Sequence, residues 1–455
     1  MVKTMDQSEI VRRVNESRVQ LVFFLYCDNG GIIRGKSAHI STLQKRLETG
    51  IGLTVAMQAM SDMDMLQPVA GMGPVGEIRL VPDLSTYTVL PYAPKRAVIL
   101  ADMLTLEQKP WEACPRAFLK RMIDRAASRG LRIQAAFEPE WTLARKEGDS
   151  FIPIDESLCF SSVGATTALP VIDDIVAALD AQGLQVEQYY PELGHGQQEL
   201  SIRHADALTA ADNHILYRET VRNVAWQHEY YASFAPKPFA DQAGNGCHIH
   251  FSAWEANGQR NLFYDPEDTY NLSQTAYNFI GGVLEHLPGL VALTCPSVNS
   301  YRRLRPNSWS SAFTCYGPDN REAALRIPSL FWDNEEASVN LELKPSDSSA
   351  NPYIALGGLM AAGLDGVDKG LLPKEGQLVE VDPATLSPDE LESRGIRRLP
   401  ANLGEAIEAL ENDPVLLDAL GPGLSRSYLA IRRGDLELFS RHDEAFELRH
   451  HFYKY

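Results

Sequence analysis

The pattern of apolar and polar residues divides the chain into a short strand-rich region and a longer mixed region. Residues 19–26 are rich in strand-forming side chains, residues 28–31 (Asp-Asn-Gly-Gly) predict a tight turn, and residues 32–36 are expected to form the return strand. Prolines between residues 110 and 115 indicate a boundary. Beyond it, predicted strands over 131–143, 184–189, 198–203 and 247–254 alternate with predicted helices over 115–129, 171–182, 207–232, 268–287, 351–368 and much of 402–449. We therefore expect an α+β protein with a small N-terminal domain, residues 1–108, and a large domain, residues 109–455.

Two histidines alternate with apolar residues in the segment 244–251, which has the sequence Gly-Asn-Gly-Cys-His-Ile-His-Phe. In an extended strand His248 and His250 point to the same face, because side chains repeat with a period of two. Glycine lets the backbone approach a ligand where a Cβ atom would clash. The segment predicts a strand that carries imidazoles into a pocket. Taken alone, it is also compatible with two polar residues on the outer face of a strand.

Five carboxylates lie on short segments that could share the face of these histidines, namely Glu138, Glu140, Glu192, Glu199 and Glu342. Glu138 and Glu140 repel each other unless a cation lies between them, although the pair alone is equally compatible with a solvated strand face. Pro139 between them lacks a ladder N–H, so this strand is expected to be irregular or at a sheet edge. Oxygen ligands with one imidazole, His248, favour Mg²⁺ or Mn²⁺ over zinc, and two such ions would orient the phosphates of ATP.

Composition narrows the function classes. The net charge is −18, which argues against nucleic acid or an anionic membrane as the main partner. The six cysteines form no CxxC pair. The N-terminus lacks the apolar segment of a signal peptide, and no apolar run approaches the about 20 residues that span a bilayer. We therefore expect a cytoplasmic protein. In this acidic chain, clustered arginines favour a carboxylate or phosphate ligand over surface ion pairing. They are Arg302, Arg303, Arg305, Arg321 and Arg326.

A series of motifs between residues 137 and 366 resembles the glutamine synthetase family. In chain order they are Phe137-Glu-Pro-Glu, Gly196-Gln-Gln-Glu, Ala211-Asp-Asn, Pro236-Lys-Pro, Gly244-Asn-Gly-Cys-His-Ile-His, Asn299-Ser-Tyr-Arg-Arg, Asn320-Arg, Arg326-Ile-Pro, Ser349-Ala-Asn-Pro-Tyr and Ala362-Gly-Leu-Asp-Gly. The resemblance implies a β-grasp N-terminal domain and a catalytic domain whose antiparallel sheet, flanked by helices, forms the active-site funnel. It also implies that ATP activates glutamate to γ-glutamyl phosphate and that an amine displaces the phosphate. A homo-oligomer is implied, commonly a dodecamer of two stacked hexamers with sites between subunits.

The resemblance also implies a role for individual residues. One metal ion would be held by Glu140, Glu192 and Glu199, and the second by Glu138, His248 and Glu342. Gly244 would lie along the bound glutamate, and Arg303 would bind its carboxylate. Arg321 would contact phosphate with Arg326 nearby, and His250 would lie close to the nucleotide. At two positions where the family has arginine, this chain has another residue. Lys344 keeps the positive charge but lacks the bidentate geometry, and Asn340, on the nucleotide side, lacks the charge.

Further departures concern the second substrate. Family members that use ammonium carry an acidic N-terminal segment, whereas the matching residues 53–58 contain no acid. They also carry a glutamate in a flap, where ungapped counting from Arg303 gives Trp309. A tyrosine of the ammonium site aligns near Phe160. Apolar and aromatic surface, which includes Val55 and Met57, therefore replaces charge and favours an alkyl or aryl amine.

Three interpretations follow from these departures. The first is an ATP-dependent γ-glutamyl ligase for an organic amine, with Asp62 and Asp64 as possible partners for the distal ammonium of a polyamine. The second is glutamine synthetase itself, which uses ammonia. The third is a non-catalytic scaffold, against which the complete set of six expected metal ligands argues.

Overall fold

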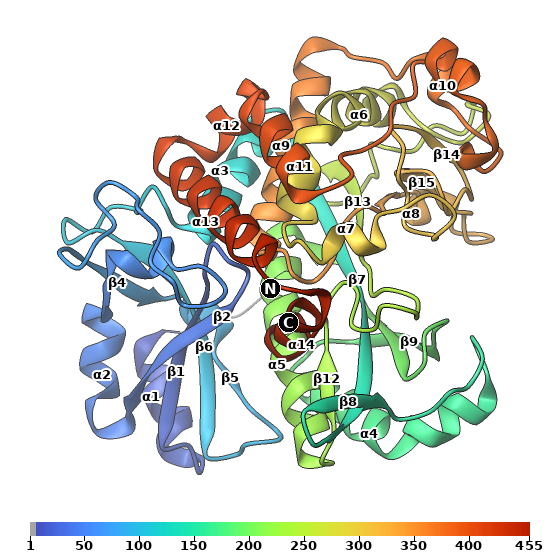
Figure 1. Cartoon of the computed structure of the whole chain (residues 1–455). Coiled ribbons are helices and arrows are strands. Elements are labelled where there is room, and N and C mark those ends of the chain that lie inside the picture. Colours follow the sequence, from blue (N-terminus) through green and yellow to red (C-terminus); the bar gives the residue numbers. More distant parts are fainter. Residues whose placement is uncertain (1–5) are drawn as a thin grey trace.

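The N-terminal part of the chain is a mixed sheet covered on one side by two helices (Figure 1). The computed structural model describes residues 6–455. The strand order is β2–β1–β6–β4–β3, with β5 paired to β6. The strands are β1 (Leu21–Cys27), β2 (Ile33–His39), β3 (Ile51–Thr54), β4 (Glu77–Pro82), β5 (Thr88–Val89) and β6 (Arg96–Leu104). The helices α1 (Gln7–Glu16) and α2 (Ile40–Thr49) bury Ile10 and Leu43 against the sheet. The predicted β1–β2 hairpin is confirmed, and the parallel pairing of β1 with β6 completes a β-grasp arrangement.

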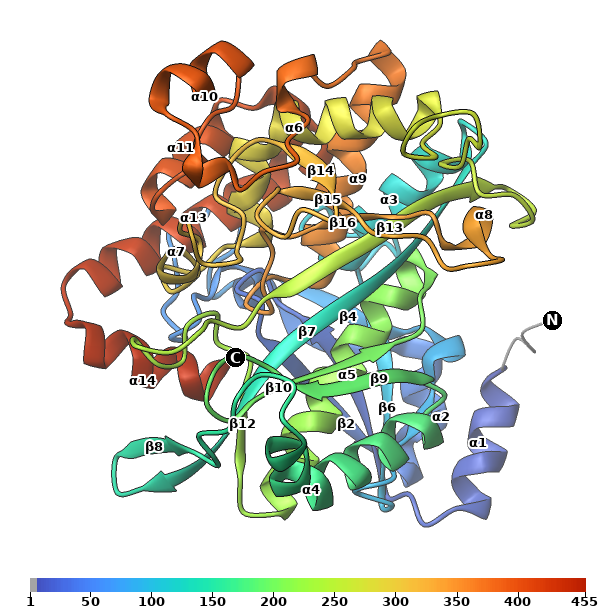
Figure 2. The ribbon, with the colours of Figure 1, turned by 90° about the vertical axis from the view of Figure 1, so that its right-hand side faces the viewer.

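The large domain is built on a ten-stranded sheet whose central strand, β7, is the longest. The order is β14–β15–β16–β13–β7–β10–β9, and β8, β11 and β12 also pair with β7. The strands are β7 (Leu131–Glu147), β8 (Ser150–Pro153), β9 (Val186–Pro191), β10 (Gln197–Ile202), β11 (Ala205–Asp206), β12 (Tyr231–Ser233), β13 (Cys247–Glu255), β14 (Tyr316–Pro318), β15 (Leu325–Ile327) and β16 (Leu341–Leu343). Figure 2 shows β7 and β13 running side by side across the molecule.

One face of this sheet is buried against helices, and alternation along each strand determines which side chains face the other way. Phe137 of β7, Ile249 and Phe251 of β13 and Leu341 of β16 lie in the main hydrophobic core. The residues between them therefore point to the opposite face. The helices of the domain are α3 (Pro115–Ala127), α4 (Ser162–Ala181), α5 (Ala207–Gln227), α6 (Gln274–Thr294), α7 (Ser300–Arg303), α8 (Glu335–Ser338), α9 (Pro352–Lys369), α10 (Pro388–Arg394), α11 (Leu403–Glu411), α12 (Pro414–Leu420), α13 (Pro422–Ser440) and α14 (Glu444–Lys454).

Two expectations were wrong, one about Pro139 and one about the bounds of a helix. β7 is a regular, central strand. Pro139 lies where the pairing partner of β7 changes, since β13 pairs with β7 up to residue 139 and β10 pairs with it from Glu140 onward. The missing N–H thus falls at a junction between two ladders. The helix expected over 268–287 begins at Gln274 and continues through Pro288 to Thr294. Dense burial of α6 in the core outweighs the hydrogen bond that Pro288 cannot make.

Helix α4 is long and apolar enough, by length and composition, to cross a membrane. It also contains Asp173, Asp174 and Pro170, and it packs against α5 and β9. These contacts are those of a helix that covers part of the protein core.

Candidate functional site

Strand register brings four of the five predicted carboxylates and His248 together on the face of the sheet opposite the hydrophobic core, and Glu192 lies in the loop that follows β9. His248 of β13 lies directly opposite Glu138 of β7, and Glu342 of β16 lies opposite His250. Glu199 of β10 lies opposite Glu140 on the other side of β7. Four strands that are distant in sequence therefore contribute to one cluster.

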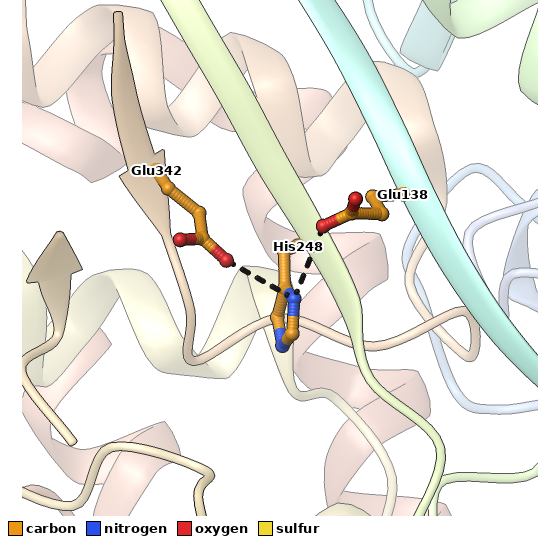
Figure 3. A group of neighbouring side chains, drawn as sticks. All are labelled: Glu138, His248 and Glu342. Atoms are coloured by element: carbon orange, nitrogen blue, oxygen red, sulfur yellow. Dashed lines mark ion pairs between the residues drawn. The ribbon is translucent and has the colours of Figure 1, made fainter. Parts of the chain in front are cut away.

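Glu138, His248 and Glu342 form the tightest group in this cluster (Figure 3). One ligand atom from each residue lies within 4.8 Å of the others. The His248 Nδ1 atom is 3.1 Å from Glu342 Oε1 and 3.6 Å from Glu138 Oε2. The Glu342 side chain is 1% exposed, so these charges are held in a low-dielectric environment.

The electrostatics of this group match the needs of a divalent cation. Burial opposes the charge of Glu138, but the hydrogen bonds from His248 and His250 outweigh it and hold its pKa well below the usual range. Burial is likewise outweighed at Glu342, where Lys344 and the two histidines lower the pKa to about 2. Burial and Lys344 lower the pKa of His248 to about 4. At neutral pH the group thus offers two carboxylates and a neutral imidazole, the protonation states that bind metal.

Glu140, Glu192 and Glu199 form the neighbouring group. Glu140 Oε2 accepts hydrogen bonds from Gln197 Nε2 at 2.8 Å and from the backbone N–H of Gly246 at 2.9 Å. Burial and the charge of Glu140 raise the pKa of Glu192 to about 6. Burial and the charges of Glu138 and Glu140 raise the pKa of Glu199 well above its usual value. Carboxylates crowded in this way favour a cation among them, so their chemistry also fits a divalent ion.

The glycines of the segment 244–251 make room for Arg303 as well as for the backbone. A Cβ atom on Gly244 would lie 3.0 Å from Arg303 Cγ, and a Cβ on Gly246 would lie 2.8 Å from His248 Nε2. Arg303, which is 5% exposed, donates to the Ser346 carbonyl at 3.2 Å, and its Nη2 lies 3.3 Å from His248 Nε2. The absent side chains therefore allow a buried guanidinium to lie beside the carboxylate cluster.

The remaining basic and nucleotide-side candidates surround the same cluster. Arg326 donates to Glu342 Oε2 at 2.5 Å, and Lys344 Nζ lies 3.4 Å from His248 Nε2. His250 contacts Asn340 Oδ1 at 2.9 Å and Glu138 at 3.2 Å; although burial opposes its charge, Glu138 raises its pKa to about 9. Arg321 is exposed on the loop before β15 and makes no contact with these groups among the hydrogen bonds and ion pairs of residues 6–455.

The residues expected to contact the amine do not form one group within the chain. Trp309 and Phe160 are 63% and 68% exposed on separate loops, and both have a positive φ angle. Val55 is buried in the N-terminal core, and Met57 packs against the same core. Both residues thus pack within their own domain, and a contact of either one with an amine stays a prediction.

Several residues that the sequence analysis did not single out support the cluster. Gln197 orients Glu140, and the Tyr190 hydroxyl donates to Glu199. Gln197 stands in a motif that was noticed, so its amide was an available signal. Tyr190 lies on the edge strand β9 and meets Glu199 only through strand pairing. Its role therefore depends on a register that sequence alone does not specify.

Comparisons with known proteins agree with this geometry. A family model described as the glutamine synthetase catalytic domain matches residues 112–451, and one described as the glutamine synthetase N-terminal domain matches residues 5–111. The chain is 38% identical to the gamma-glutamylpolyamine synthetase GlnA3 of Streptomyces coelicolor, over 91% of this chain and 89% of that protein. It is 33% identical to the glutamine synthetase of Pyrococcus horikoshii, over 96% of each chain.

Two solved structures are also similar to this chain over nearly its whole length. The GmaS/ADP complex superimposes with a TM-score of 0.85 at 30% identity and covers 99% of both chains. A novel glutamine synthase homolog superimposes with a TM-score of 0.85 at 33% identity and covers 96% of this chain and 99% of that one. The matching models span both domains, the fold is shared throughout, and family members are ATP-dependent ligases. The chain therefore belongs to the glutamine synthetase family and is an ATP-dependent ligase.

Proposed function

We propose that this ligase joins the γ-carboxylate of glutamate to an organic amine, with ATP converting that carboxylate to γ-glutamyl phosphate. One observation carries the proposal: the carboxylate–histidine cluster is assembled, while the positions that match residues of the family's ammonium site hold the exposed aromatic residues Trp309 and Phe160. The similarity to a protein named gamma-glutamylpolyamine synthetase and to GmaS supports the same class of reaction.

In this proposal the six clustered side chains hold Mg²⁺ or Mn²⁺. Glu140, Glu192 and Glu199 hold one ion, and Glu138, His248 and Glu342 hold the other. When bound, the ions supply positive charge that offsets the charge of the transferred phosphoryl group. Gln197 and the Gly246 N–H keep Glu140 in place, so that the carboxylates are oriented before substrate arrives.

The basic residues of the site orient glutamate and phosphate. Arg303, buried beside Gly244, binds the glutamate carboxylate, and Lys344 stabilises charge on the phosphoryl group. Arg326 holds Glu342 and lies close to the phosphates, while Arg321 reaches them from its exposed loop. On the nucleotide side, His250 and Asn340 form a hydrogen-bonded pair at 2.9 Å, in which Asn340 replaces a charged contact by a neutral one.

On the amine side, Trp309 and Phe160 pack against the carbon skeleton of an alkyl or aryl amine. Val55 and Met57 contribute from a neighbouring subunit in a homo-oligomer, for which we propose a dodecamer of two stacked hexamers. Localisation in the cytoplasm is part of the same proposal.

A polyamine is the second candidate, favoured by the named relative. The acidic residues expected to bind its distal ammonium differ in accessibility. Asp62 is 4% exposed, whereas the Asp64 side chain is 71% exposed and pairs with Arg34 at 2.7 Å. The burial of Asp62 favours an apolar amine, and the exposed Asp64 keeps a polyamine as the second candidate.

The test is phosphate release with glutamate, Mg²⁺-ATP and a panel of amines: ammonium, alkylamines, an arylamine and polyamines. We expect an alkyl or aryl amine to have the highest kcat/KM. Ammonium as the best substrate would refute the proposal in favour of glutamine synthetase, and a polyamine would select the second candidate. No turnover with any amine would favour a non-catalytic role.

A further inference from the structure

Residues 305–311 form a loop with an unusual backbone between the buried residues Leu304 and Ala312. Three alternate residues, Asn307, Trp309 and Ser311, have φ angles of 57°, 55° and 64°. The left-handed region is unfavourable for residues with a Cβ atom, and asparagine tolerates it better than tryptophan or serine. Trp309 and Ser311 therefore keep this conformation only if surrounding groups stabilise it.

That stabilisation comes from the segment that precedes β15. The backbone N–H of Trp309 donates to Glu322 Oε1 at 2.6 Å, a charge-assisted hydrogen bond. The Ser311 hydroxyl donates to the Ala323 carbonyl at 2.8 Å. The segment is itself fixed, since the Glu322 N–H donates to Asn320 Oδ1 at 3.0 Å. Both strained residues are thus tied to the same short stretch.

The loop lies at the rim of the functional site. It closely follows Arg303, whose guanidinium is 3.3 Å from His248 Nε2. Burial raises the pKa of the Glu322 carboxyl, and the charge of Lys344, which also contacts His248, partly offsets this rise. The Trp309 side chain is 63% exposed, so its indole is free to contact a ligand.

We propose that Glu322 is a positioning residue that determines amine specificity through Trp309. By accepting the Trp309 N–H, it fixes the loop so that the indole stands over the amine side of the site. Glu322 does not touch the substrate; its effect passes through the loop backbone. The inference rests on the proposed function, because it assigns Trp309 to the amine.

The test compares two variants at position 322. Gln in E322Q keeps an oxygen that accepts the Trp309 N–H but removes the charge, whereas E322A removes the acceptor. The matched control is E187A, because Glu187 makes a surface pair with Arg203 at 2.9 Å, far from β15 in the strand order. The first readout is hydrogen exchange of a peptide that covers residues 305–311, with the β13 peptide 247–255 as an internal reference for folding.

We expect E322A to raise the exchange rate of the loop at least about tenfold, and E322Q by less than about threefold, while residues 247–255 and E187A are unchanged. The second readout is kinetic. E322A should raise the KM for the preferred organic amine about tenfold and leave the KM values for glutamate and ATP unchanged, and E322Q should resemble the wild type.

Two results would overturn the inference. Unchanged loop exchange in E322A would mean that Glu322 does not hold the loop, whichever amine is the substrate. Equal kinetic losses in E322Q and E322A would mean that the carboxylate charge itself acts on the substrate. The exchange measurement needs no substrate, so failure of the clamp is distinguishable from failure of the proposed function, which the amine panel reports.

Discussion

The buried Arg116 joins the two domains, and its replacement by methionine tests how strongly this junction stabilises the fold. Arg116 lies in the first turn of α3 and is 3% exposed. It binds both oxygens of Asp212 on α5, at 3.0 and 2.7 Å. The same guanidinium donates to Asp102 of β6 at 2.9 Å and to Asp83, directly after β4, at 2.8 Å. One side chain thus connects the N-terminal sheet to the helices of the catalytic domain.

Methionine fills a similar volume but leaves Asp212 buried without its counter-charge. Burial already raises the pKa of Asp212, and Arg116 partly offsets that rise. Breaking one partner of a buried ion pair costs about 3–5 kcal/mol. With about 2 cal/mol/K of unfolding entropy per residue, a chain of 455 residues should lose about 3–5 °C in Tm.

Differential scanning calorimetry at fixed protein concentration measures this loss. The control is R129M, because Arg129 binds Asp368 at the surface, where both side chains are about one-third exposed, and it should lose less than about 1 °C. The double variant R116M/D212N should be more stable than R116M, because the amide that D212N introduces is neutral and can still accept the hydrogen bond that Tyr353 donates to Asp212. Equal Tm values for R116M and R129M would refute the reasoning.

Three further predictions concern charge and the site. Burial opposes the charge of His286, but hydrogen bonds to Asp413 and Asp365 raise its pKa. The stabilisation from the charged imidazole is therefore present at pH 6 and is lost as the pH rises through the raised pKa. The Tm difference between wild type and H286N should be larger at pH 6 than at pH 9, and a constant difference would contradict this. E342Q should weaken Mn²⁺ binding at least about tenfold in calorimetric titration, and unchanged affinity would remove Glu342 from the metal group. W309E should shift the ratio of kcat/KM values toward ammonium, whereas unchanged selectivity would exclude Trp309 from the amine site.

Alternation along strands indicated which side chains could share a face, and the resemblance to the glutamine synthetase family selected the cluster among them. Glu138, His248 and Glu342 each stand between apolar neighbours, and a period of two places them on the face away from the core. Alternation does not specify register, however. That His248 lies opposite Glu138 depends on the pairing of strands that are more than 100 residues apart in the chain. The same long-range pairing determines that Pro139 lies at a ladder junction and that β7 is central.

Local patterns were least informative about side chains on loops. Trp309 was found by counting from a motif, but its positive φ angle and its bond to Glu322 arise from contacts between two loops. The burial of Val55 in the N-terminal core likewise results from the packing of helices and sheet, which the short apolar segment 53–58 does not reveal. Tertiary contacts of this kind override local pattern.

The two halves of the proposed reaction are therefore supported by different kinds of structure. Most of the proposed metal ligands, namely Glu138, Glu140, Glu199, His248 and Glu342, stand on paired strands, where backbone ladders and a buried core restrict movement. The aromatic residues assigned to the amine, Trp309 and Phe160, stand on exposed loops with left-handed backbone conformations. A loop can change length or sequence without disturbing strand register. Changes in amine preference should consequently map to these loops and their anchors, such as Glu322, and leave the carboxylate–histidine cluster intact.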